Sequence, residues 1–208
     1  TGLVVGKFCP LHRGHQLLLD HAQAACAQLI VVSYTKPGFA GMEPQRREQW
    51  LRSLYPGAQH WVLDDARLAA HCQRLGLPKR ALPDNDASDA VHRLFMAWLL
   101  REVIRQQVDV VFSSEDYGPG FAEVLSQQQQ LHGGCAVAHV AVDPARRTVP
   151  ISGTALRADL HAQRRQLAPQ VYRHFVKRVV LLGGESTGKS TLARRLAECC
   201  GSVQIGRA

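Results

Sequence analysis

The stretch GKFCPLHRGH, residues 6–15, follows a short apolar run at residues 3–5. A second glycine-rich stretch, GGESTGKST at residues 183–191, follows another apolar run at residues 179–182. Each pattern predicts a strand, a tight loop and a helix, an arrangement that points backbone N–H groups and a positive helix end at a phosphate. The sequence therefore predicts two nucleotide-binding segments in one chain.

Between these stretches, apolar runs alternate with segments of helical periodicity. Besides those at residues 3–6 and 179–182, we expect strands at residues 29–35, 59–63, 108–114 and 136–142. We expect helices at residues 14–28, 44–55, 67–75, 118–130 and 152–163, and a long helix from a cap at Asp86 or Ser88 to residue 107. Strands alternating with helices indicate the α/β class, with a doubly wound parallel sheet that binds ligands at the carboxyl ends of its strands.

Composition and charge exclude several other classes. The chain is 46% hydrophobic, yet no apolar stretch approaches the roughly 20 residues that cross a bilayer, so we expect a cytoplasmic protein without a membrane partner. The six cysteines form no C-x-x-C pair, which argues against a zinc site or a disulfide framework. The net charge of +8 suits nucleic acid or polyanionic small molecules. Because no basic run or aromatic-interleaved basic stripe is present, we expect no nucleic-acid partner.

The polar residues of the first stretch are suited to binding phosphate. His12 and His15 are spaced i, i+3 at a helix start, so they share one face and can donate to phosphate oxygens. Ser152 and Thr154 begin another predicted helix, and Arg157 lies one turn further on. These three residues predict a second anion site, suited to a leaving pyrophosphate.

The second stretch matches G-x-x-x-x-G-K-[ST], the P-loop pattern. Lys189 is expected to reach the β- and γ-phosphates and Ser190 to bind Mg²⁺, while the loop amides surround the phosphates. The predicted P-loop residues are Gly183, Gly184, Glu185, Ser186, Thr187, Gly188, Lys189, Ser190 and Thr191. The sequence ends at residue 208, so we expect this kinase-like portion to lack the further strands, carboxylate and lid of a complete kinase.

Several motifs together resemble a known family. Residues 6–15 match G-x-F-x-P-x-H-x-G-H, and residues 151–157 resemble I-S-x-T-x-x-R, both typical of the nucleotidyltransferase superfamily. With a P-loop added, the chain resembles the NadR-type bifunctional family, nicotinamide mononucleotide (NMN) adenylyltransferase joined to ribosylnicotinamide kinase. The segments at residues 112–115 and 142–144, and Arg47 and Trp50, agree with that family. The family's helix-turn-helix has no counterpart before residue 3 of this sequence.

The resemblance implies a Rossmann-like adenylyltransferase domain at residues 1–165, a connecting helix at 166–176 and the start of a P-loop kinase domain at 177–208. It implies transfer of the adenylyl group of ATP to NMN, giving NAD and pyrophosphate, with Mg²⁺ as cofactor. The implied catalytic residues are Lys7, His12, His15 and Arg157, and the implied ATP-binding residues are Gly6, Phe8, Gly14, Ser152 and Thr154. The implied substrate-binding residues are Arg47, Trp50, Trp98, Ser113 and Glu115.

Two other functions agree with the same residues. A pantetheine-phosphate adenylyltransferase or a cytidylyltransferase would share the first stretch, but neither accounts for the P-loop. A non-catalytic sensor of ATP or NAD would use both segments for binding only. The sequence leaves open whether the protein forms a homo-oligomer.

Overall fold

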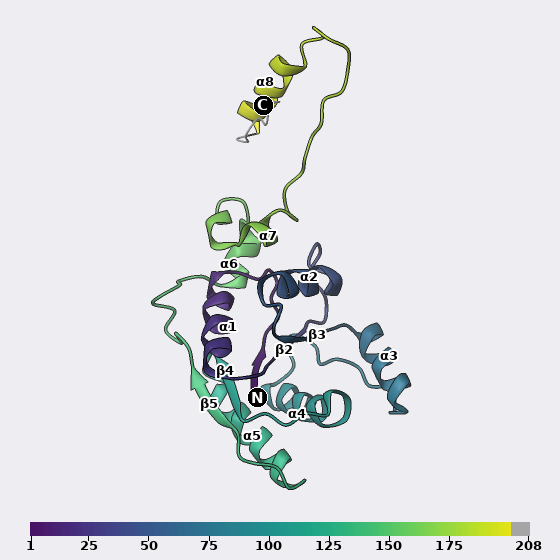
Figure 1. Cartoon of the computed structure of the whole chain (residues 1–208), viewed down its shortest axis with the longest axis vertical. Helices are drawn as coiled ribbons and strands as arrows, with labels where there is room; N and C mark the ends of the chain where they lie inside the picture. The colour runs from purple at the N-terminus through teal and green to yellow at the C-terminus, as the bar shows by residue number, and fades with distance from the viewer. Residues whose placement is uncertain (201–208) are drawn as a thin grey trace. The chain divides into compact units, whose positions relative to one another are not determined.

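The computed structural model describes residues 1–200 and divides the chain into two compact units, Thr1–Phe175 and Val176–Ala208 (Figure 1). The first unit is built on a five-stranded sheet in the order β3-β2-β1-β4-β5, with every neighbouring pair parallel. The strands are β1 (Gly2–Val5), β2 (Leu29–Tyr34), β3 (Gln59–Leu63), β4 (Val110–Ser113) and β5 (Ala138–Ala141). The prediction of an α/β fold with a parallel sheet is confirmed.

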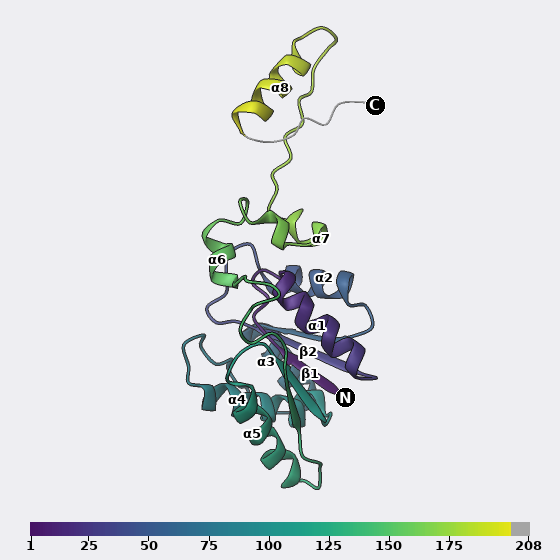
Figure 2. The same ribbon diagram turned by 90° about the vertical axis from the view of Figure 1, so that its left-hand side faces the viewer.

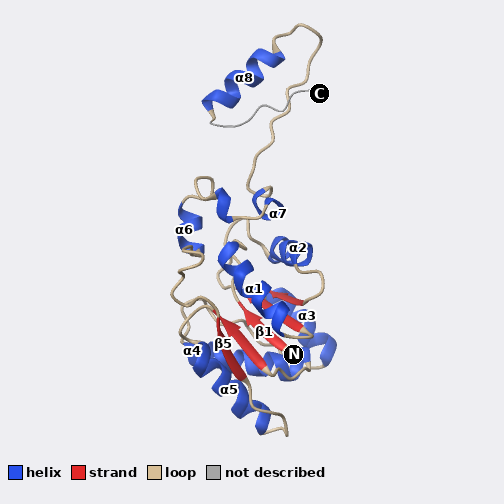
Figure 3. Ribbon diagram, turned by 60° about the vertical axis from the view of Figure 1, so that its left-hand side comes forward, coloured by secondary structure: helices blue, strands red, loops and turns tan. Residues whose placement is uncertain are grey.

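Helices cover both faces of this sheet, as Figures 2 and 3 show for α1 and α2 on one side and α4 and α5 on the other. The helical segments of the first unit are α1 (Arg13–Ala25), α2 (Pro44–Leu54), α3 (Asp65–Leu75), α4 (Asp89–Trp98), the π-helical turn η1 (Leu99–Ile104), α5 (Gly118–Gln130), α6 (Gly153–Ala158), the 3₁₀ turn η2 (Arg164–Gln166) and α7 (Pro169–Tyr172).

The alternation of side chains along each strand divides the core into two layers. Leu3 of β1 packs in a cluster with residues of α3, α4 and α5, whereas Val4 packs in a second cluster with residues of α1 and α2. Both side chains are completely buried, which is expected for a parallel strand covered on its two faces. Because helices cover both faces of the sheet, the polar loops lie at the ends of the strands.

Three helices end at least three residues earlier than the sequence predicts. The first, α1, ends at Ala25 rather than residue 28, because Cys26 has an extended backbone with φ of −141°. The helix after Ser152 ends at Ala158 rather than residue 163, because the backbone of Asp159 leaves the helical conformation with φ of −149°. The long helix ends at Ile104 rather than residue 107, because Arg105 adopts the left-handed conformation with φ of 57°. None of these differences moves a predicted phosphate-binding residue off its element.

The second unit contains α8 (Lys189–Cys199) after the glycine-rich loop. The strand predicted at residues 179–182 is absent from the described part of this unit, and Val179, Val180 and Leu182 are exposed. A P-loop strand normally lies inside a parallel sheet. Within residues 176–200 no neighbouring strand is present to pair with the backbone of 179–182. The end of the predicted kinase domain, residues 201–208, lies outside the described residues.

Within residues 1–200, no helix combines the length and apolar character that a membrane span requires.

Candidate active site

A cavity of about 420 Å³ opens at the carboxyl ends of β1, β2 and β4. Its wall includes the loop after β1, the beginning of α4 and the beginning of α6. Eight residues predicted from sequence line it: Gly6, Lys7, Phe8, His15, Glu115, Ser152, Thr154 and Arg157. The first stretch and the residues 152–157, which are far apart in sequence, therefore meet at one site.

His12 is held at the start of α1 and does not line the cavity itself. Its Nδ1 accepts hydrogen bonds from the backbone N–H groups of Gly14 at 3.1 Å and His15 at 3.4 Å. A Cβ atom at Gly14 would lie 3.1 Å from the His12 ring, so a larger residue there would push the ring out of place. His12 therefore acts as the N-cap of the helix that presents His15.

The His15 ring stacks on His12 with the centroids 3.7 Å apart, and its Nδ1 accepts from the backbone N–H of His12 at 3.4 Å. Burial, aided by the charges of Arg146 and Arg157, lowers the pKa of His12 to about 4. Burial also lowers the pKa of His15 well below its usual value, as do His12 and Arg146, while the Pro10 carbonyl acts in the opposite direction. Both rings are therefore neutral at pH 7. Because each Nδ1 accepts a hydrogen bond, each Nε2 holds the proton and is a donor.

The loop after β1 has a strained residue at its centre. Phe8 has φ of 49° and is completely buried. Its ring lies against Gly6, where an added Cβ would approach it to 3.1 Å. This close contact explains why a glycine precedes Lys7 and how the backbone of the loop comes to face the cavity.

Arg157 connects α6 to this loop. Its Nη1 donates to the carbonyl oxygen of Cys9 at 2.7 Å and its Nη2 donates to Thr154 Oγ1 at 3.0 Å. Its guanidinium also lies 4.3 Å from the centre of the Phe39 ring. The Ser152 hydroxyl accepts from the backbone N–H of Ala155 at 3.2 Å, so it caps α6. The cation is thus held in one place at the cavity wall.

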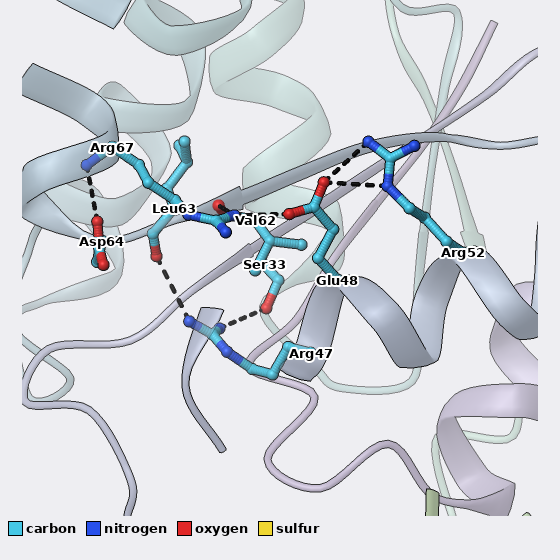
Figure 4. A network of polar contacts seen from close by, with 8 residues as sticks. All are labelled: Ser33, Arg47, Glu48, Arg52, Val62, Leu63, Asp64 and Arg67. Carbon is cyan, nitrogen blue, oxygen red and sulfur yellow. Dashed lines mark hydrogen bonds and ion pairs between the residues drawn. The ribbon is translucent and has the colours of Figure 1, made fainter. Parts of the chain in front are cut away.

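Arg47 does not line the cavity, although the sequence places it among the substrate-binding residues. It is 1% exposed, and it donates to the Lys7 carbonyl at 3.2 Å and to Ser33 Oγ at 2.6 Å. Figure 4 shows this guanidinium between Ser33 and Leu63, beside a second network in which Glu48 pairs with Arg52 and Arg67. Arg47 therefore positions the ends of the strands that form the cavity.

Three more predicted substrate-binding residues lie outside the lining of this cavity. Trp50 is completely buried, and its Nε1 donates to His174 Nδ1 at 2.9 Å. Trp98 packs against the core beside Arg80, whose guanidinium carbon is 4.6 Å from its ring. Ser113 is 1% exposed and its hydroxyl contacts His139 Nε2 at 2.9 Å. These side chains occupy the packed faces of their helices and strand, which a motif alone does not reveal.

Other cavity residues were missed by the sequence analysis. They are Tyr34, Asn85, Asp89, His92, Arg93 and Arg146, together with apolar neighbours. Tyr34 is the last residue of β2, and its position at a strand end was a usable signal. Arg146 lies two positions after the segment 142–144, which the sequence analysis had singled out. The others come from the loop before α4 and from α4, which only the tertiary fold brings to the cavity.

The glycine-rich loop of the second unit contains three residues with positive φ. Gly183, Ser186 and Gly188 have positive φ values of 159°, 56° and 77°. The Lys189 ammonium donates to the carbonyl oxygen of Gly184 and to Thr187 Oγ1, so it lies folded over the loop. The Ser190 side chain lies in the first turn of α8. This loop offers backbone amides, one ammonium and one hydroxyl to a phosphate ligand.

The fit of both segments to Mg²⁺ can be tested from their side chains. Within the part of the chain that the structure describes, no group of three or more His, Cys, Asp or Glu side chains is placed to hold a metal. The carboxylates of the first cavity, Asp89 and Glu115, each pair with an arginine. Mg²⁺ often binds through substrate phosphates and water with few protein ligands. These residues therefore fit a metal that arrives on a triphosphate, with Ser190 as a single ligand in the second unit.

Comparisons with known proteins agree with this architecture. No protein-family model matches the chain. The chain is 28% identical over 202 residues to the trifunctional NAD biosynthesis/regulator protein NadR of Escherichia coli (strain K12), covering 94% of this chain and 45% of that protein. The protein of the same name from Salmonella typhimurium (strain LT2) is 29% identical over the same length. The chain spans about half the length of the curated relatives it matches.

Two solved structures have the same fold. A crystal structure of NadR protein in complex with NR superimposes with a TM-score of 0.60 at 21% identity, covering 95% of this chain and 50% of that chain. A second, of NadR protein in complex with NAD and AMP-PNP, gives the same score and identity and is covered to 52%. At this identity the likeness establishes the fold alone.

Proposed function

We propose that this chain, a homologue of the NadR proteins over 94% of its length, transfers the adenylyl group of ATP to NMN and releases pyrophosphate. The principal observation is the stacked pair His12 and His15 at the start of α1, beside Lys7 and Arg157 in one cavity. Two relatives named for NAD biosynthesis, and a NadR protein solved in complex with NAD and AMP-PNP, support the choice of substrates.

The chemistry proposed is an in-line attack of the NMN 5′-phosphate on the α-phosphorus of ATP. A phosphate monoester is already largely ionised at neutral pH, so the attack needs no general base. The reaction also needs no protein nucleophile, which agrees with Cys9, whose pKa burial raises to about 11. Catalysis then depends on positioning and on stabilising the charge that develops on the phosphate oxygens.

Each role in this scheme falls to a residue with a suitable position. His15 Nε2 is a neutral donor for an α-phosphate oxygen, and His12 fixes the ring that provides it. Lys7 lines the cavity and neutralises phosphate charge, while Arg157 of α6 faces the leaving pyrophosphate. Mg²⁺ would supply additional charge neutralisation on the triphosphate.

We propose the same division of the chain as the sequence predicts. Residues 1–165 form the adenylyltransferase domain, residues 166–176 connect it, and residues 177–208 begin a ribosylnicotinamide kinase-like domain. The structure adds that Val171 of α7 is completely buried, so most of the connecting segment packs with the first unit. NMN, ATP and NAD are the proposed small-molecule partners.

The test is incubation of the protein with Mg-ATP and one acceptor at a time, followed by measurement of pyrophosphate and of the nucleotide product. NMN is expected to give NAD, whereas pantetheine phosphate with ATP, and CTP with a phosphorylated alcohol, are expected to give no product. Transfer to pantetheine phosphate alone would contradict the proposal. Binding of ATP without transfer to any acceptor would instead favour a sensor.

A further inference from the structure

The loop between β5 and α6 forms one wall of the cavity and has a defined shape. The Asp143 carboxylate accepts backbone hydrogen bonds from Arg147 at 2.8 Å, from Thr148 at 3.1 and 3.2 Å and from Val149 at 3.2 Å. Asp143 and Arg146 both have positive φ, 48° and 50°. Residues are held in this uncommon region only where their surroundings require it. The loop therefore places the Arg146 side chain at the cavity by a specific backbone path.

Arg146 lies close enough to the histidine pair to affect both rings. Its charge is among the causes that lower the pKa of His12 and of His15. Arg157 affects His12 in the same way from the beginning of α6. Two guanidinium groups, from different segments, therefore act on the rings that are expected to meet the phosphates.

The two arginines differ in how they are held. Arg157 donates to the Cys9 carbonyl and to Thr154, so its position is fixed without a carboxylate. Arg146 has one polar side-chain partner within residues 1–200, Glu115, whose Oε1 is 3.3 Å from its Nη2. The two side chains are 44% and 56% exposed, and ion pairs this open to water contribute little to stability. A triphosphate has several negative charges, so it can replace a single carboxylate as the partner of Arg146.

We propose that Arg146 is a further phosphate-binding residue of the adenylyl-transfer site and that Glu115 competes with ATP for its guanidinium. The proposal rests on the proposed function for the identity of the nucleotide. Glu115 follows β4 and Arg146 follows β5, so the pair bridges two loops beside the cavity when no phosphate is bound. Binding of ATP then exchanges one ion pair for a stronger one.

Competition predicts changes of opposite sign. Arg146→Ala removes a charge-assisted contact and is expected to weaken ATP binding about 10- to 100-fold. Glu115→Gln frees the guanidinium and is expected to tighten ATP binding about 2- to 5-fold. In an Arg146→Ala background, Glu115→Gln is expected to have a much smaller effect, because no guanidinium remains to be released. If the ion pair were only structural, both single variants would weaken binding.

The measurement is calorimetric titration with the magnesium complex of α,β-methylene ATP, without NMN. All variants have Lys189→Ala added, so that the P-loop of the second unit does not contribute to the titration. Arg146→Lys, which keeps the charge, is expected to restore part of the affinity. Arg101→Ala is the matched control, because Arg101 pairs with Glu102 at 2.7 Å, is 46% exposed and does not line this cavity.

Unchanged affinity in Arg146→Ala, or weaker binding in Glu115→Gln, would overturn the proposal. If Arg146→Ala does not fold, Glu115→Gln and Arg146→Lys still give the sign of the effect. A wild-type chain that binds the analogue but makes no NAD from NMN would refute the proposed function and leave this inference standing. If the wild-type chain makes NAD from NMN but the Arg146→Ala variant binds the analogue with unchanged affinity, this inference is refuted and the proposed function stands.

Discussion

The rings of His12 and His15 stack with centroids 3.7 Å apart, and each accepts a hydrogen bond from the backbone N–H of the other residue. This reciprocal arrangement is the capping box that begins α1. It connects helix formation with the chemistry of the site, because the same two bonds fix the rings as neutral Nε2 donors. Replacement of either residue therefore affects the helix start and the donor together.

His15→Ala is expected to reduce adenylyl transfer by about two to four orders of magnitude, because a donor to the transition state is lost. Steady-state kinetics with NMN and Mg-ATP would measure the effect, and circular dichroism would check that the variant is folded. His132→Ala, in an exposed histidine that contacts Arg101, is the control. Near wild-type turnover in His15→Ala would remove His15 from the mechanism.

The stability of the first unit is expected to fall with acid because His12 is neutral when folded. The pKa of His12 is about 4 in the structure, against about 6.5 for an unperturbed histidine, so the unfolded chain binds a proton first. The contribution of the neutral His12 ring to the free energy of unfolding is fully present above pH 6.5 and is lost progressively as the pH falls through 4. The loss between pH 8 and pH 5 is about 2 kcal/mol.

Urea unfolding at pH 8 and pH 5 would test this. His12→Asn keeps an N-cap acceptor but cannot titrate, so it is expected to show a smaller loss between the two pH values. If the wild type and His12→Asn lose the same free energy of unfolding between pH 8 and pH 5, protonation of His12 does not account for the loss.

Arg157→Ala is expected to raise the KM for ATP about 10- to 100-fold and to change kcat less, because a contact to the leaving phosphates is lost in the ground and transition states alike. Arg157→Lys is expected to recover only part of the affinity, since an ammonium cannot donate to Cys9 and Thr154 as the planar guanidinium does. A KM for ATP that stays at the wild-type value would mean that Arg157 only joins α6 to the first loop.

Trp50→Phe is expected to reduce the free energy of unfolding by about 1 to 2 kcal/mol and to leave the KM for NMN unchanged. The variant keeps the aromatic packing in the core but removes the bond from Nε1 to His174. Chemical unfolding and steady-state kinetics would measure the two quantities. A large rise in the KM for NMN without loss of stability would return Trp50 to the substrate site.

The buried position of Trp50 shows a feature that could not be predicted from the sequence. Residues 44–55 have helical periodicity, so α2 was predicted to within one residue, but periodicity does not say which neighbour the apolar face meets. Arg47 and Trp50 are one turn apart and both turn toward the interior. The packing of the helix thus places both side chains in the interior, and their assignment to the substrate stays a prediction.

The first stretch was easier to predict because its interactions are local. The strand, the loop containing Gly6 and the helix start at His12 depend on residues within ten positions of one another. The strand order and the meeting of Arg157 with the Cys9 carbonyl depend on contacts between distant segments. The strand predicted at residues 179–182 shows the same dependence, since the second unit offers it no neighbouring strand between residues 176 and 200.

The P-loop of the second unit is expected to bind phosphate but not to phosphorylate ribosylnicotinamide in this 208-residue polypeptide. Binding needs the loop amides, the Lys189 ammonium and the start of α8, all of which are present. Phosphoryl transfer also needs a carboxylate for the metal or the nucleophile. From residue 176 onward the acidic residues are Glu185, within the loop, and Glu198, about 12 Å along α8 from Ser190.

A calorimetric titration with inorganic phosphate and an assay of ADP release with Mg-ATP and ribosylnicotinamide separate the two properties. Lys189→Ala is expected to abolish phosphate binding at this loop, while Arg173→Ala, an arginine of the first unit, is the control for loss of one positive charge. Ribosylnicotinamide-dependent ADP release at about 1 per second or faster, abolished by Lys189→Ala, would contradict the prediction. Such turnover would require that Glu185 or Glu198 reach the metal, because residues 201–208 contain no aspartate or glutamate.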